Sequence, residues 1–332
     1  MKRMIVIGSV LVVAGIVCSS WGFLIHRTIH QLAIYELPPS MRYFFHRNMN
    51  EVVKKSVRPD QRRSADKNEA PKHYIDLELY GDSAAWKMPL RWKDAVKKYG
   101  MDSLEKGGYV PYYVVTMKER LTAAFRSGNK DSILFYAADL GHYISDAHVP
   151  LHVTENYDGQ LSGQKGLHSL WESMVPEIEI QQYDLRSRHK ARYLKHPERD
   201  IWRAVRQSSK LLKDVFAQEK AVTKTFTESE KYRVQMRNGK EYKSYTSAFA
   251  KAYSARLGNT INRQLISSAN LVADFWYTSW VDAGCPNLNK TIQWQGKKKE
   301  KNNLQDEMEA FKTNKLIEKK LLIAKQSQEK EE

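Results

Sequence analysis

Apolar residues recur at helical spacing through most long segments of this chain, and the alternation that marks a half-buried strand is hard to find. The pattern predicts helices over residues 21–37, 109–126, 131–148 (capped by Asp131 or Ser132), 200–225 and 245–282, the last interrupted near Gly258. The chain has 332 residues, 42% of them hydrophobic, and no internal repeat, so it is long enough to bury one large core. We therefore expect a single all-α, multi-helix domain.

The two ends of the chain differ in composition from this domain. Residues 1–20 carry two basic residues, a short apolar run and small residues before Trp21, which is the layout of a secretory signal peptide, with an uncleaved anchor as the alternative. Residues 296–332 are rich in Lys and Glu and hold too few apolar residues for a core. We expect a signal peptide over 1–20, a folded domain over 21–295, and an exposed helix or disordered tail over 296–332. The product would be exported, periplasmic or secreted, after cleavage before Trp21.

Charge and cysteine content narrow the partners and the sources of stability. The formal net charge is +16, and most of it belongs to the folded part. This excess favours polyanions, either nucleic acid or an anionic lipid surface, and no protein partner is predicted. Cys285 is the only cysteine outside the predicted leader, so an exported chain would depend on core burial, bound metal or both instead of a disulfide.

The stretch GHYISDAHVPLHV places three histidines and an aspartate in a segment that otherwise reads as buried helix. His142 and Asp146 are four residues apart and so share one helix face, His168 and Glu172 repeat the spacing, and His152 lies between the pairs. A hydrogen-bonded core cluster, a surface face and a metal site all remain open explanations. Burying five such groups unpaired would be very costly, and a metal removes that cost. Imidazole together with carboxylate suits zinc better than calcium or magnesium.

Three further motifs accompany this cluster. WGFLIH contains Trp21 and His26, RPDQRR contains an aspartate and a basic residue three positions later, and HYID contains a histidine, an aromatic residue and an aspartate. Together the motifs resemble the superfamily that joins the single-strand-specific zinc nucleases with the bacterial zinc-dependent phospholipases C. The resemblance covers residues 21–172 and implies nine metal ligands: Trp21, His26, Asp60, His73, His142, Asp146, His152, His168 and Glu172.

The resemblance implies an all-α fold with a trinuclear zinc cleft that holds three Zn²⁺ ions. The implied sites are Asp60, His73, His142 and Asp146 for one ion; Trp21, His26 and the shared Asp146 for a second; and His152, His168 and Glu172 for the third. Trp21 would bind through its free α-amino nitrogen and its carbonyl oxygen. Removal of the leader would therefore be an activation step.

The same resemblance implies the chemistry of P–O bond hydrolysis. A metal-activated hydroxide would attack phosphorus in line, and the third ion would stabilise the leaving oxygen. Arg63 would hold a phosphate oxygen, and Asp60 would be both a ligand and a candidate proton acceptor. Tyr74 would stack on a base or belong to the core, and Asp76 would read a base edge or orient His73.

The substrate class stays open between two branches of the superfamily. The five-residue step from Trp21 to His26 resembles the nucleases, whereas Glu172 resembles the phospholipases at a position where fungal and plant nucleases usually have Asp. We expect a nuclease or nucleotidase that acts on single-stranded nucleic acid or nucleotides. The alternatives are a phospholipase C that acts on phospholipid head groups and a non-catalytic, zinc-stabilised binding module.

Overall fold

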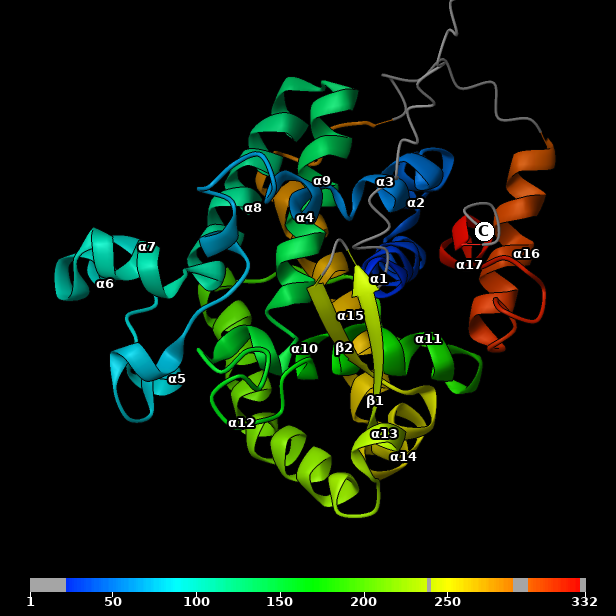
Figure 1. Cartoon of the computed structure of the whole chain (residues 1–332). Coiled ribbons are helices and arrows are strands. Elements are labelled where there is room, and N and C mark those ends of the chain that lie inside the picture. The colour runs from blue at the N-terminus through cyan, green and yellow to red at the C-terminus, as the bar shows by residue number, and fades with distance from the viewer. Residues whose placement is uncertain (1–21, 238–239, 289–297, 329–332) are drawn as a thin grey trace, which may run out of the picture.

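The computed structural model describes residues 22–237, 240–288 and 298–328, and helices dominate it (Figure 1). The helices are α1 (Phe23–Glu36), α2 (Pro39–Arg47), α3 (Met49–Lys55), α4 (Arg58–Arg62), α5 (Ala84–Lys87), α6 (Trp92–Tyr99), α7 (Met101–Gly107), α8 (Val110–Ser127), α9 (Lys130–Asp146), α10 (Leu167–Ser169), α11 (Val175–Glu179), α12 (Pro197–Thr223), α13 (Glu228–Lys231), α14 (Ser247–Leu257), α15 (Thr260–Asp282), α16 (Lys298–Lys312) and α17 (Ile323–Gln328). Short 3₁₀ turns cover Ala70–Lys72, Leu77–Tyr80, Pro150–Val153 and Ile180–Gln182, and a π-helical turn covers Leu170–Met174. The predicted all-α fold is confirmed.

Helices α1 and α15 form the centre of the domain. Nearly every residue of α1 is buried, because α15, α3, α9 and α17 all pack against it. A helix that is covered on all sides needs an apolar surface all round, and the sequence FLIHRTIHQLAIYE supplies most of it. The polar groups that α1 does bury, His26 among them, are therefore held on a rigid element inside the protein.

The helices expected from apolar spacing are present with small shifts at their ends. The long fifth segment divides at Gly258 into α14 and α15, as predicted. The cap of α9 was predicted two or three residues too late: the side chain of Asn129 accepts a hydrogen bond from the Ser132 amide, so neither Asp131 nor Ser132 is the cap. Between the first two predicted helices, residues 57–72 contain α4 and a 3₁₀ turn.

One pair of strands lies among the described residues, and the sequence pattern did not predict it. Strands β1 (Tyr232–Arg237) and β2 (Lys240–Tyr245) form an antiparallel hairpin in which Tyr232 pairs with Tyr245. In β1 the apolar residues Tyr232, Val234 and Met236 alternate with polar ones, but Val234 and Met236 are exposed and β2 places Lys243 and Glu241 opposite them, so the alternation marks no buried face.

The C-terminal segment is not an exposed or disordered tail over its described residues, contrary to the expectation from its composition. Helices α16 and α17 lie against the domain beside α1 and α2 (Figure 1). The Tyr35 hydroxyl donates to Glu307 (2.9 Å), and the Gln31 amide donates to the Leu321 carbonyl (2.8 Å). Six of the ten apolar residues in its described part are buried, and the other four are partly buried; the buried ones are Leu304, Ala310, Phe311, Leu316, Leu322 and Ala324. Their number is small, but their placement on one side suffices to dock the segment.

The predicted signal peptide over residues 1–20 and the predicted ligand Trp21 lie outside the described residues. Within the described ranges, none of the helices combines the length with the apolar character that a bilayer crossing requires. Cys285 is exposed and its thiol is free.

Candidate metal centre

Eight of the nine predicted ligand side chains meet in one continuous array. They come from elements far apart in sequence, and the ninth residue, Trp21, lies outside the described chain. Three subsets each bring their donor atoms within 4.8 Å of one another, namely His26, His142 and Asp146; Asp60, His73 and His142; and His152, His168 and Glu172. The structure thus gathers residues that the sequence separates by up to 146 positions, from His26 to Glu172.

The first part of the array joins α9 to the segment that follows α4. The Nδ1 atom of His73 lies 2.9 Å from one carboxylate oxygen of Asp146 and 3.1 Å from Nε2 of His142. Asp60 closes the group, with its Oδ1 atom 3.7 Å from His73 and 3.6 Å from His142. These four residues present their nitrogen and oxygen atoms to one common point.

The second part of the array lies at the start of the π-helical turn. The Nε2 atoms of His152 and His168 are 3.0 Å apart, and Glu172 places Oε2 at 2.6 Å from His168 and 3.4 Å from His152. The π turn precedes Pro176, which lacks the N–H that α-helical geometry would direct to the Glu172 carbonyl. Local widening of a helix of this kind is frequent at functional sites.

His26 connects the two parts. Its Nε2 atom lies 3.6 Å from Oδ1 of Asp146 and 3.5 Å from Oε1 of Glu172, and its ring stacks on His142 with centroids 4.1 Å apart. Asp146 therefore faces His26 with one carboxylate oxygen and His73 with the other. That arrangement is the one a bridging carboxylate requires.

Burial and the neighbouring charges shift the pKa values of several array residues in opposite directions. Burial would raise the pKa of Asp146, but the neighbouring imidazoles of His142, His152 and His73 hold it well below its usual range. Burial would lower the pKa of His152, but Asp146 and Glu172 raise it to about 9. Burial lowers the pKa of His142 to about 3. In the metal-free protein, protons therefore occupy positions that a cation would otherwise take.

Two of the five imidazoles have the nitrogen that faces away from the array held by a backbone carbonyl. Nδ1 of His142 pairs with the Ser56 carbonyl at 2.8 Å, and Nδ1 of His152 pairs with the His73 carbonyl at 2.7 Å. Such contacts fix the tautomer and the ring orientation of a liganding histidine. The array is thus oriented by the fold before any ion is considered.

Behind His73 lies Glu69, a residue that sequence reasoning missed. Its Oε1 atom is 3.6 Å from Nε2 of His73, and Tyr143, Arg62 (3.0 Å) and Lys72 (2.7 Å) donate to the same carboxylate. Orientation of His73 was one of the two roles predicted for Asp76, but the carboxylate behind His73 is that of Glu69. The four-residue spacing of Glu69 and His73 was the signal for this contact in the sequence. Sequence reasoning missed it because pairs at this spacing are common on ordinary helices.

The predicted substrate residues lie around the accessible edge of the array. The Arg63 side chain is 43% exposed, with Nη1 at 3.7 Å from Oδ1 of Asp60. Tyr74 is half-buried, and its hydroxyl donates to the Lys106 carbonyl at 3.4 Å. Burial, Glu78 and Glu155 raise the pKa of Asp76 to about 7. Neither Tyr74 nor Asp76 belongs to the buried core.

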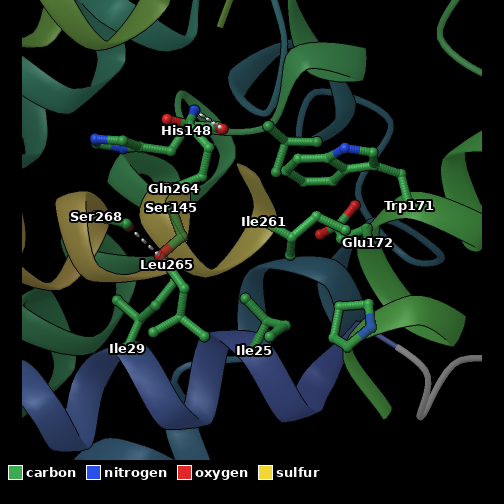
Figure 2. Close-up of a pocket in the computed structure, with 12 residues that line it drawn as sticks. Ile25, Ile29, Ser145, His148, Trp171, Glu172, Ile261, Gln264, Leu265 and Ser268 are labelled. Atoms are coloured by element: carbon green, nitrogen blue, oxygen red, sulfur yellow. Dashed lines mark hydrogen bonds between the residues drawn. The ribbon is translucent and has the colours of Figure 1, made fainter. Parts of the chain in front are cut away.

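A small pocket lies on the inner side of the array (Figure 2). Apolar residues such as Ile25 and Leu265 line it together with Glu172 and His148, and its volume of about 20 Å³ leaves room for roughly one water molecule. The Nδ1–H group of His148 donates to the Ile144 carbonyl (2.8 Å), and His148 takes no part in the array. Substrate must therefore approach from the opposite side.

That opposite side holds the two most exposed members of the array. The side chains of Asp60 and His168 are each 26% exposed, whereas those of His26, His73, His142 and Asp146 are almost completely buried. A ligand from solvent therefore reaches the array along the edge between Asp60 and His168, next to Arg63.

The donor set itself fits zinc. Five imidazoles and three carboxylates supply mixed nitrogen and oxygen ligands, whereas calcium and magnesium sites in proteins use oxygen alone. The groups His26–His142–Asp146 and His152–His168–Glu172 each offer three protein donors, which leaves a coordination position open, as in catalytic sites, whereas Asp146 adds a fourth donor beside Asp60, His73 and His142.

Comparison with known proteins agrees with this geometry. The sequence model of a family described as S1/P1 Nuclease matches residues 21–275. A search of curated proteins gives no match. The matched range contains the whole array and ends before α16.

Proposed function

The chain belongs to the S1/P1 nuclease family and is therefore a nuclease-type hydrolase of phosphodiester bonds; from that premise we propose that it cleaves single-stranded nucleic acid or nucleotides with three zinc ions. The convergence of eight nitrogen- and oxygen-bearing side chains carries the proposal. A non-catalytic zinc module would close its coordination shells, and the three-donor group of His152, His168 and Glu172 argues against closed shells.

Zinc, when bound, supplies Lewis-acid polarisation of the phosphoryl group and a nucleophile at neutral pH. The residues of the chain do the rest. Arg63 lies at the open edge and binds a non-bridging phosphate oxygen, since its guanidinium is 43% exposed and only loosely paired with Asp60. Tyr74 offers a ring on which a base stacks. Burial and the nearby charge of Asp76 raise the pKa of Tyr74, so Asp76 lies near enough to this ring to contact the edge of that base.

We extend the proposal to the amino terminus. The first described residue, Gly22, lies beside Glu172. A Cβ atom added to Gly22 would be 3.5 Å from Oε1 of Glu172. A residue 21 that carries a free amine would thus begin next to the array. We infer export, cleavage before Trp21, and use of the new terminus as the ninth ligand. Amino-terminal sequencing of the exported product tests this, and a first residue other than Trp21 would refute it.

Phospholipase C activity is the competing proposal, because the acidic residue at position 172 is Glu. One substrate panel separates the two activities. Mature protein is incubated with single-stranded DNA, RNA and phosphatidylcholine, and zinc content is measured on the same samples. Cleavage of the nucleic acids alone supports the nuclease, and cleavage of phosphatidylcholine alone would reject it.

The site assignment has its own test. His142→Ala should abolish turnover and lower the zinc content, because Nε2 of His142 faces both Asp60 and Asp146. His148→Gln is the matched control, since His148 is buried six residues further on but lies outside the array. Unchanged turnover in the first variant, or equal loss in both, would contradict the assignment.

A further inference from the structure

The segment between the Ile180–Gln182 turn and α12 carries a basic residue at every second position. Arg186, Arg188, Lys190 and Arg192 alternate with Ser, His and Ala, and residues 183–194 have no helical or strand structure. In an extended chain, every second side chain points to the same side, with roughly 7 Å between neighbours. The alternation therefore favours a row of cations along one side of this segment.

The intervening residues anchor the segment to the core. His189 pairs through Nε2 with Asp274 of α15 at 2.7 Å, and the Ala191 amide donates to the Glu36 carbonyl at the end of α1 (3.0 Å). The Leu185 amide donates to Asn314, which follows α16. The segment is thus fixed on both sides by buried or partly buried hydrogen bonds.

A groove opens beside this segment, between it and helices α2 and α16. Its volume is about 740 Å³, which is within the range of ligand sites in proteins. We call it the basic groove and define it by the five cationic side chains that line it: Arg42, Arg186, Arg188, Lys190 and Lys312. The docked C-terminal segment supplies Lys312, so the groove exists only because α16 packs on the domain.

Most of these cations have no acidic partner. Among the described residues, no carboxylate forms an ion pair with Arg42, Arg188, Lys190 or Lys312. Arg42 is the most telling case, because it is half-buried, donates through Nε only to the Leu37 carbonyl (2.9 Å), and has its pKa lowered by that burial. A desolvated guanidinium without a counter-charge is stabilised by an anion.

The acidic groups near the groove do not neutralise it. Asp184 is paired with Arg186 at 2.6 Å, and Asp274 is paired with His189. Burial and nearby Asp274 raise the pKa of Glu36 to about 8, so Glu36 is mostly protonated near neutral pH. The groove therefore keeps a net positive charge.

We propose that the basic groove is a second binding site for the phosphate backbone of polynucleotides, separate from the metal centre. The inference rests on the proposed function, which makes nucleic acid the substrate. His26 in the array and Glu36 at the groove are ten residues apart on α1, which is about 15 Å along the helix. A substrate of a few nucleotides occupies the metal centre alone, whereas a long strand reaches both sites.

Binding to oligonucleotides of two lengths tests the groove. Zinc-loaded protein is titrated with hydrolysis-resistant phosphorothioate oligothymidylates of 4 and 30 nucleotides over a range of salt concentrations. The double variant Arg188→Gln with Lys190→Gln should bind the 30-mer about tenfold more weakly, with a salt slope smaller by roughly 1.4, since each lost phosphate contact on a single strand removes about 0.7. Binding of the 4-mer should not change.

The control removes the same charge elsewhere. Lys213→Gln with Lys220→Gln neutralises two exposed lysines of α12 that do not line the groove. An unchanged salt slope in the groove variant, an equal loss in the control, or equal weakening for both oligonucleotides would overturn the proposal. So would a loss of binding to phosphatidylserine vesicles with 30-mer binding retained. Turnover of unmodified 4-mer by the wild type is measured separately, so a failure of the nuclease proposal is distinguished from a failure of the groove.

Discussion

Replacement of Glu69 by glutamine removes one charge behind His73 and keeps the size of the side chain. Glu69 is 1% exposed and accepts from Tyr143, Arg62 and Lys72 while facing Nε2 of His73 at 3.6 Å. Burial alone would raise the pKa of Glu69, but the nearby His73 imidazole and hydrogen bonds from Lys72, Tyr143 and Arg62 hold it below its usual range. The carboxylate is thus ionised at neutral pH and increases the basicity of His73.

The magnitude of the effect follows from these contacts. Loss of a carboxylate behind a liganding histidine typically lowers metal affinity about 10- to 100-fold, or roughly 1.4 to 2.8 kcal/mol. The amide keeps one acceptor oxygen, so the fold should lose the equivalent of about one charge-assisted hydrogen bond, roughly 1.5 to 3 kcal/mol in the free energy of unfolding. We expect Glu69→Gln to fold and to bind zinc more weakly.

Competition with a chromophoric chelator measures the zinc affinity directly. A denaturant titration of protein from which a chelator has removed the zinc measures the free energy of unfolding. Asp66→Asn is the matched control, because Asp66 is 46% exposed, lies near Lys72 (3.9 Å) and makes no contact with His73. Wild-type zinc affinity in Glu69→Gln, with normal folding, would refute the role of Glu69. Equal weakening in both variants would show that the general loss of negative charge is responsible.

Three other expectations follow from the same structure. Phe311→Ala should lower the free energy of unfolding by about 3 to 5 kcal/mol in a denaturant titration. Phe311 is 3% exposed, and its ring centroid lies 5.2 Å from that of Tyr35. If residues 298–328 were an exposed tail, the substitution would have no effect. Gly108→Ala should raise KM for single-stranded DNA several-fold with little change in zinc content. Gly108 has a φ of 76°, and an added Cβ atom would lie 2.4 Å from the Tyr74 carbonyl. An unchanged KM would contradict this prediction. In metal-free protein the raised pKa of His152, about 9 against an ordinary 6.5, stabilises the fold fully below pH 6.5, and this contribution is lost as pH rises through 9. Chemical unfolding across that window should show the loss, and His152→Gln should flatten it.

Much of the architecture could be read from the spacing of apolar residues. The helices now labelled α1, α8, α9, α12, α14 and α15 were all predicted, because a helix repeats its buried positions every three to four residues within one continuous segment. In the hairpin β1–β2 only β1 alternates apolar with polar residues, and this six-residue pattern was not recognised as a strand. The segment 298–328 was misjudged because composition counts apolar residues and does not say which side they occupy.

For the metal centre too, some features could be read from the sequence and others could not. The sequence by itself determined which side chains are available as ligands and that His142 with Asp146, and His168 with Glu172, lie one helical turn apart, because both are local properties. Only the tertiary structure decided that His26, Asp60 and His73 approach them, that Glu69 and not Asp76 stands behind His73, and that α16 closes a basic groove. These features depend on contacts between residues far apart along the chain. The packing of the core sets those contacts, and no periodic pattern in the sequence indicates them.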